Sequence, residues 1–163
     1  MAPDSGTALP PRAREGSGWS WRFRRLTLRE AGLLLEAQCW LLLCQYLRYR
    51  RPVGQLLRPA TSRATSRPLD RRQFDTITGV VWALTRAARY GVFRPKCLVR
   101  SMALERMLRR HGFEGGEIHI GVRLEEGDLK AHAWVEWDGR ILGDDPRHVR
   151  TFVPATDLRL VEL

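Results

Sequence analysis

The chain has 163 residues and a formal net charge of +10, which is enough length for one domain with a real core and a short accessory segment. Lys96 and Lys130 are the only lysines, so the other 26 of the 28 basic residues are arginines. Such a balance suits nucleic acid, an anionic membrane or an acidic peptide as a partner, but arginine richness also arises from a GC-rich genome.

The three cysteines, Cys39, Cys44 and Cys97, form no even disulfide framework, no CxxC pair and no zinc-type spacing. This excludes a disulfide-stapled secreted domain and favours a reducing, cytoplasmic setting. No metal-binding or nucleotide-binding motif is present, so we expect neither a metal nor another cofactor.

The N-terminus, residues 1–20, is rich in Pro, Gly, Ser and Ala and has no apolar core of a signal peptide. We therefore expect a disordered tail there. The sequence TLRE at Thr27 predicts a capping box, in which the Thr27 hydroxyl accepts from the Glu30 amide and the Glu30 carboxylate reaches back. A helix should follow and stop near Pro52 and Gly54.

This first helix is nearly apolar from Ala31 to Leu47, which raises the question of a membrane span. The stretch is shorter than the roughly 20 residues that a bilayer needs, and it carries Glu36 and two glutamines. A buried scaffold helix is the favoured interpretation, ahead of partner docking or attachment to a membrane surface. Burial is also the favoured interpretation for Cys39 and Cys44.

A basic connector rich in Ser, Thr and Pro leads to Asp70, which can cap a second helix. Its predicted core stripe is Phe74, Ile77, Val81, Leu84 and Ala88. A third helix begins near Cys97, after Pro95, and ends before Gly112. Its apolar positions are Leu98, Met102, Leu104, Met107 and Leu108.

After Gly116 the hydrophobic period changes to two. The segments EIHIGVRL, LKAHAWVEW and RILGD, separated by turns, predict an antiparallel meander, and we expect a further short strand in VRTFVPA. Helices followed by an antiparallel sheet predict an α+β fold.

The most informative pair of residues is Cys97 at a helix start and His132 within a strand. Unpaired backbone N–H groups and the positive end of the helix dipole favour a nucleophilic thiolate at Cys97. A thiol nucleophile needs a base, and the base needs a third group to orient it. An aspartate from the sequence ILGDDP can supply that group. By the residues alone, Cys97 can equally be a buried small hydrophobe and His132 an ordinary strand residue.

The turn at Asp138 and Gly139 decides which aspartate meets His132. A two-residue type I′ turn would pair Trp137 with Arg140 and set His132 opposite Asp145. A three-residue loop would pair Glu136 with Arg140 and set His132 opposite Asp144. We favour the second register, and therefore Asp144, because it brings opposite charges face to face. His111, His119 and His148 are interpreted as structural or solvated.

The stretch CLVRSMALERMLRRHGFEGGEIHIGVRL, followed by AHAWVEWDGRILGDD, resembles the lasso peptide biosynthesis B2 family, leader peptidases of the transglutaminase-like cysteine protease superfamily. The resemblance covers roughly Cys97 to Asp145. It implies a triad of Cys97 as nucleophile, His132 as base and then acid, and Asp144 as orienting group, with the adjacent Asp145 as the alternative. Where the family often has alanine after the CLxR arginine, this chain has Ser101.

We expect three parts along the chain: a disordered tail at 1–20, a helical segment with its connector at 21–69, and a domain at 70–163. The resemblance implies that this domain is a transglutaminase-like cysteine protease. It implies cleavage of one peptide bond, which releases the leader of a ribosomally made precursor. The family's leader-binding element is a PqqD-like winged helix, and no such pattern precedes Cys97. We therefore expect a separate B1 leader-recognition protein as partner, with the macrolactam cyclase as a further one.

Two rival functions remain. The arginines and tryptophans would also suit a nucleic-acid-binding module, although no nucleic-acid motif is present. Another transglutaminase-like thiol acyltransferase would share the same triad. Nucleic acid is not among the partners we predict, and membrane-surface association is the less favoured interpretation of the first helix.

Overall fold

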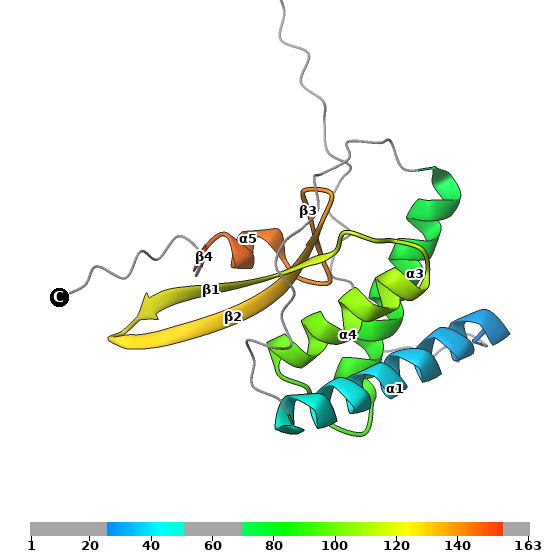
Figure 1. The fold of residues 1–163 in the computed structure, drawn as a ribbon, viewed down its shortest axis with the longest axis horizontal. Coiled ribbons are helices and arrows are strands. Elements are labelled where there is room, and N and C mark those ends of the chain that lie inside the picture. Colours follow the sequence, from blue (N-terminus) through cyan, green and yellow to red (C-terminus); the bar gives the residue numbers. More distant parts are fainter. Residues whose placement is uncertain (1–25, 51–69, 155–163) are drawn as a thin grey trace, which may run out of the picture.

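The computed structural model describes residues 26–50 and 70–154. Three long helices come first, then a meander of strands with one short helix near its end (Figure 1). The helices are α1 (Leu28–Arg50), α3 (Arg71–Tyr90), α4 (Cys97–Arg110) and α5 (Pro146–Val149). The strands are β1 (Glu117–Glu125), β2 (Asp128–Trp137), β3 (Arg140–Leu142) and β4 (Val153–Pro154). The predicted α+β fold is confirmed.

Local sequence explains where the helices begin. The Thr27 amide donates to the Glu30 carboxylate at 2.8 Å and the Glu30 amide donates to the Thr27 hydroxyl at 3.2 Å, so the predicted capping box is confirmed. Asp70 caps α3 in the same reciprocal way with Gln73. Lys96 precedes α4 in an extended conformation and makes no side-chain cap, which leaves the amides at the start of this helix without a side-chain partner.

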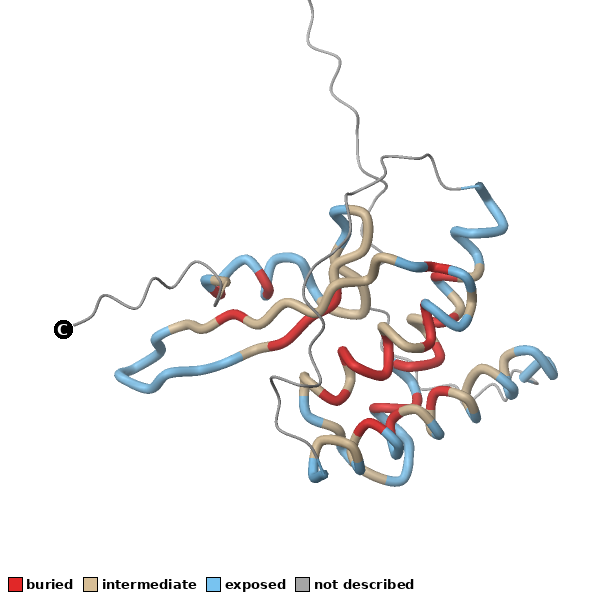
Figure 2. The backbone as a smooth tube through the Cα atoms, viewed as in Figure 1, coloured by how far each residue is buried: buried red, intermediate tan, exposed pale blue. Residues whose placement is uncertain are grey.

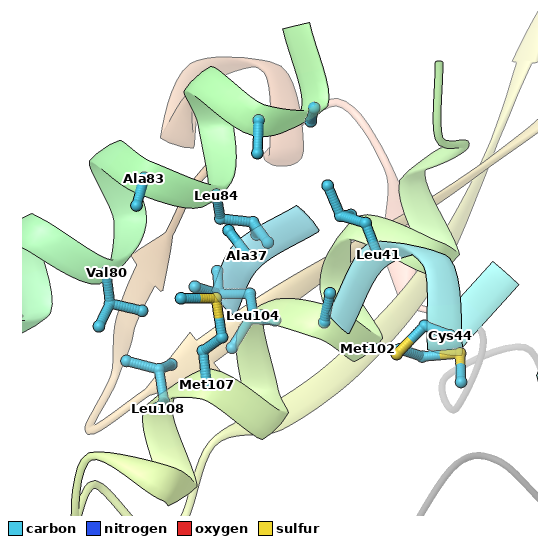
Figure 3. Packing of buried hydrophobic residues seen from close by; sticks show 14 of the residues in the cluster. Ala37, Leu41, Cys44, Val80, Ala83, Leu84, Met102, Leu104, Met107 and Leu108 are labelled. Atoms are coloured by element: carbon cyan, nitrogen blue, oxygen red, sulfur yellow. The ribbon is translucent and has the colours of Figure 1, made fainter. Parts of the chain in front are cut away.

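The three long helices share one hydrophobic core. Figure 3 shows the side chains of α1, α3 and α4 converging, with Ala37, Leu84 and Met107 among those where they meet. Met102, Met107 and Leu108 on α4 are at most 1 % exposed, so α4 is the central helix of the layer. Burial of this kind is the main stabilising contribution to a domain of this size.

The helix α1 is part of this core. Ala37, Leu41 and Cys44 are fully buried in the same cluster as the apolar residues of α3 and α4, which confirms the predicted scaffold helix. None of the helices in residues 26–50 and 70–154 is long and apolar enough to cross a bilayer. The predicted domain boundary between residues 69 and 70 stays a prediction, although α1 packs across it.

The four strands form one antiparallel sheet in the order β3-β2-β1-β4. β1 and β2 are a long hairpin whose far end projects away from the helices and is exposed (Figures 1 and 2). The buried residues of this hairpin are Gly121, Ala133, Trp134 and Val135, of which Val135 packs in the helical core. The predicted extra strand in VRTFVPA is present as β4.

Alternation along β2 gives the sheet two different faces. Val135 and Trp137 pack against the helical core, whereas Trp134 packs on the other face with Val149 and Phe152. His132 lies on the same face as Trp134, two residues away. The sheet therefore separates a structural face from a face that carries the histidine.

The structure corrects two predictions of buried residues, Phe74 and Cys39. Phe74 is 54 % exposed and not core, because it lies in the first turn of α3, which projects beyond the other helices. Cys39 is exposed, whereas Cys44 is buried as expected, because only the Ala37–Leu41–Cys44 side of α1 faces the core. The predicted tail, the connector and the stop at Pro52 and Gly54 lie outside the described residues.

Leu41→Ala should reduce the free energy of unfolding by about 2–5 kcal/mol, because it leaves a cavity where α1 packs on the other helices. Leu35→Ala on the same helix is the matched control, since Leu35 is 68 % exposed. That control should change stability by less than about 0.5 kcal/mol. Urea denaturation of the two variants measures this, and equal midpoints would contradict the role of α1 in the core.

Candidate active site

The His132 side chain meets an acidic partner from the loop that follows β3. His132 Nε2 donates to Asp144 Oδ2 at 2.6 Å, and the two side chains are 14 % and 19 % exposed. A short hydrogen bond to a carboxylate, largely shielded from water, fixes the orientation of the ring. Since Asp144 occupies Nε2, Nδ1 is the ring nitrogen that remains for another partner.

The hairpin register that we favoured from the sequence is wrong, although Asp144 is the residue that meets His132. Trp137 pairs with Arg140 across a two-residue turn in which Asp138 and Gly139 both have positive φ, 50° and 72°. Asp and Gly tolerate positive φ, so the chain forms the two-residue type I′ turn and not the three-residue loop.

Asp144 reaches His132 because the strand ends early. β3 stops at Leu142, and Gly143 follows with a φ of 73°. The β2–β3 pairing therefore ends at Leu142, and its register does not decide which aspartate meets His132. The chain turns at Gly143 and brings Asp144 back toward β2.

The neighbouring Asp145 has a different role. It precedes α5 as its N-cap, and its side-chain Oδ1 accepts from the Arg147 amide at 2.9 Å. Its own amide donates to Asp144 Oδ1 at 2.9 Å. The two aspartates therefore have different roles. Asp144 accepts the hydrogen bond of the histidine, while Asp145 caps the helix that follows and donates its amide to Asp144.

Cys97 is the first residue of α4 and is partly buried. It lines a small cavity together with Asp144 and with Ala133, the residue that follows His132. The cavity is about 10 Å³, the space of about one water molecule. Within the described residues Cys97 makes no hydrogen bond to the His132 ring, and such bonds often tighten only when substrate binds.

Two further residues of the sequence CLVRS tie α4 to this site. Ser101 Oγ donates to the Ala133 carbonyl at 3.0 Å, and Arg100 Nη2 donates to the Gly143 carbonyl at 3.2 Å. Sequence reasoning missed both roles. The signal was present in the spacing, because residues three and four positions after Cys97 lie on the same side of a helix.

Aromatic rings pack around the histidine. The His132 ring meets His148 edge to face and Phe152 at a tilt, each at 5.1 Å between centroids, and it stacks near Trp134 at 6.3 Å. His148 was interpreted from the sequence as structural or solvated, yet it lies in contact with the site. Nothing in the local sequence pattern indicated this, because the short helix α5 brings it there.

The remaining histidines and cysteines lie elsewhere. His111 pairs with Glu36 at 3.1 Å, and His119 stacks on Trp134 between two glutamates. Burial raises the pKa of the Cys44 thiol, against the opposing charge of Arg106, so Cys44 is held in the neutral form. In the described part of the chain no group of three His, Cys, Asp or Glu side chains could hold a metal ion.

Opposite His132 on β1 lies Gly121, in the sequence IGV. A Cβ atom there would approach the Phe152 Cβ and the Trp134 ring to 2.9 Å. Real Cβ atoms do not come so close, so only glycine lets these two aromatic residues pack down beside His132.

The family model for the transglutaminase-like superfamily matches residues 40–157, which include every element from the second half of α1 to β4. No curated protein and no solved structure matches the chain. The match covers Cys97, His132 and Asp144.

Gly121→Ala should destabilise the protein by about 1–3 kcal/mol, because Trp134 and Phe152 must shift to admit the methyl group. Gly116→Ala is the control, since a Cβ there would meet its neighbours at an ordinary 3.8–3.9 Å. Thermal or urea unfolding compares the two. Equal stability of the two variants would show that the aromatic packing beside His132 does not require Gly121.

Proposed function

The chain belongs to the transglutaminase-like superfamily, and from that premise we propose that it is a cysteine peptidase that removes the leader from a ribosomally made lasso peptide precursor. The observation that carries the proposal is the 2.6 Å hydrogen bond from His132 to Asp144, beside the helix that begins at Cys97. Cys97 lines the same small cavity as Asp144, so the residues present are a helix-start thiol and a histidine oriented by a carboxylate near that thiol. Nucleophilic acyl transfer needs these groups.

In the proposed reaction the Cys97 thiolate attacks the scissile carbonyl. The positive end of α4 favours the thiolate, because the amides of the first helical turn have no intrahelical acceptor. The first such bond in this helix runs from the Arg100 amide to the Lys96 carbonyl at 3.1 Å. The Cys97 amide is therefore our candidate donor to the oxyanion that forms during the attack.

His132 moves the proton. Its Nδ1 takes the thiol proton and later gives it to the leaving amine, while Asp144 on Nε2 keeps the ring in place and stabilises its charged form. Water then attacks the Cys97 thioester with His132 as base, and the free carboxylate product leaves. The enzyme returns to its starting state without a metal or another cofactor.

The narrower assignment, a leader peptidase, is supported by the sequence resemblance to the lasso peptide biosynthesis B2 family. It extends from CLVRS through IGV to HAWVE and GDD. Two residues of these motifs have a physical role in the structure: Arg100 bonds to the loop of the site, and Gly121 makes room for the aromatic residues. Ser101, where the family often has alanine, bonds to the strand. We place the reaction in the cytoplasm, where a catalytic thiol stays reduced.

We propose that a separate B1 protein of the PqqD-like type presents the leader. The described residues contain three long helices, the short helix α5 and the sheet, and none of these elements forms a winged helix. The cyclase that consumes the new N-terminus is the further partner in this scheme.

Cys97→Ala and His132→Ala should each abolish cleavage of the cognate precursor, because one removes the nucleophile and the other its base. Mass spectrometry of the precursor, incubated with B1 and either variant, measures the products. Cys39→Ala is the matched control, since Cys39 is an exposed thiol on α1, and it should cleave at the wild-type rate. Omitting B1 should slow cleavage by the wild-type protein.

The same experiment separates the alternatives. Cleavage that persists in Cys97→Ala would contradict the thiol mechanism, and unchanged cleavage without B1 would contradict the partner assignment. A product joined to an added amine in place of water would indicate an acyltransferase. Steeply salt-dependent DNA or RNA binding that survives Cys97→Ala, without cleavage by the wild type, would indicate a nucleic-acid-binding module.

The two adjacent aspartates give a second test. Asp144→Ala should lower kcat by about 100-fold or more, because the imidazole loses its orienting group. Asp145→Ala should instead cost about 1 kcal/mol of stability through loss of the helix cap, with a much smaller effect on kcat. Single-turnover cleavage together with urea unfolding distinguishes the two, and the reverse pattern would assign the orienting role to Asp145.

A further inference from the structure

The first turn of α4 presents three side chains on one side. Cys97, Arg100 and Ser101 are separated by three and four residues, so they are neighbours on the helix surface. All three line the small cavity that Asp144 and Ala133 also line. The turn that supplies the proposed nucleophile therefore also supplies two hydrogen-bond donors at the same place.

Ser101 reaches the strand of the histidine. Its hydroxyl donates to the carbonyl of Ala133 at 3.0 Å, and Ala133 follows His132 directly. Ser101 is 5 % exposed and is the one buried polar residue among those the structure describes. A buried hydroxyl needs its partner, so this bond fixes where α4 lies along β2.

Arg100 reaches the loop of the aspartate. Its guanidinium donates to the Gly143 carbonyl at 3.2 Å, and Gly143 directly precedes Asp144. The residues 26–50 and 70–154 contain no ion pair between Arg100 and Asp144, so Arg100 acts through the backbone. A charged donor makes a stronger bond than a neutral one, which suits a loop that leaves the sheet at a glycine with positive φ.

We propose that Arg100 and Ser101 are positioning residues that set the spacing between Cys97 and the His132–Asp144 pair. Each bonds to the backbone of a residue next to one member of the pair. A shift of α4 along the sheet would have to break both bonds as it moved Cys97 away from Asp144. This inference rests on the proposed function for its consequence in catalysis, but the geometry can be tested without the precursor.

The test is the rate at which iodoacetamide alkylates Cys97 in the full-length protein, followed by peptide mass spectrometry, which separates Cys97 from Cys39 and Cys44. The His132→Ala variant gives the reference rate, which is the rate of alkylation of Cys97 when the thiol has no base. Arg100→Ala should slow alkylation of Cys97 by about 10-fold, because misplacement of reacting groups by about 1 Å costs up to about 100-fold. Ser101→Ala, which removes one oxygen and keeps the fold, should slow it by about 3-fold.

Arg109→Ala is the matched control. It removes the same type of side chain from the same helix, but Arg109 pairs with Glu105 on the outer side of α4. Its alkylation rate should equal that of the wild type. Circular dichroism and urea unfolding of each variant report whether the fold is kept, and Ser101→Ala tests the proposal if Arg100→Ala fails to fold.

Double variants separate positioning from general destabilisation. A residue that acts through Asp144 has nothing left to position once that carboxylate is gone. Adding Arg100→Ala to Asp144→Ala, or Ser101→Ala to His132→Ala, should therefore change the alkylation rate by less than about 2-fold.

Equal rates in Ser101→Ala, Arg100→Ala and Arg109→Ala would overturn the proposal. Full effects that persist in the double variants would also overturn it, because they would show that the two residues act independently of the pair. Failure of the proposed function is a separate result: the precursor would stay uncut while the alkylation pattern held.

Discussion

The hydrogen bond between the His132 imidazole and the Asp144 carboxylate is the interaction on which the rest of the site depends. One partner is in the middle of a strand and the other follows the end of a different strand, so only the packed sheet holds them at 2.6 Å. Water would weaken such a bond, but the rings of Trp134, Phe152 and His148 pack around the imidazole, and the two bonded side chains are only 14 % and 19 % exposed. The face of the sheet is therefore built around the histidine.

The helical layer performs the complementary task. α4 is the most buried helix, anchored by α1 and α3, and it presents Cys97 at its first turn. Its buried methionines and leucines make it a rigid support, and rigid supports place reacting groups more reproducibly than loops do. Two glycines shape the sheet: Gly121 lets the aromatic rings lie close to β1 on the face away from α4, and Gly143 turns the chain so that Asp144 points back.

Periodicity and capping chemistry were sufficient to predict the elements. The TLRE capping box, the helix start at Cys97 and the change to a two-residue period are local signals, and all were confirmed. The register of the last hairpin could not be obtained in this way, because a type I′ turn and a three-residue loop both suit Asp138 and Gly139. Asp144 was the correct partner of His132 for a reason that the sequence concealed, the early end of β3 at Gly143. The contacts of His148 and Arg100 are long-range, and only tertiary packing creates them.

The central claim is that the two ring nitrogens of His132 have different partners: Nε2 donates to Asp144, and Nδ1 is free to act on Cys97. NMR of the protein labelled with ¹⁵N at histidine observes this difference directly, because a proton in a short hydrogen bond resonates far downfield and couples to its own nitrogen. The account predicts such a proton on Nε2 of His132, lost in Asp144→Ala and retained in Asp145→Ala. A downfield proton that survives in Asp144→Ala, or one that is bound to Nδ1, would contradict it.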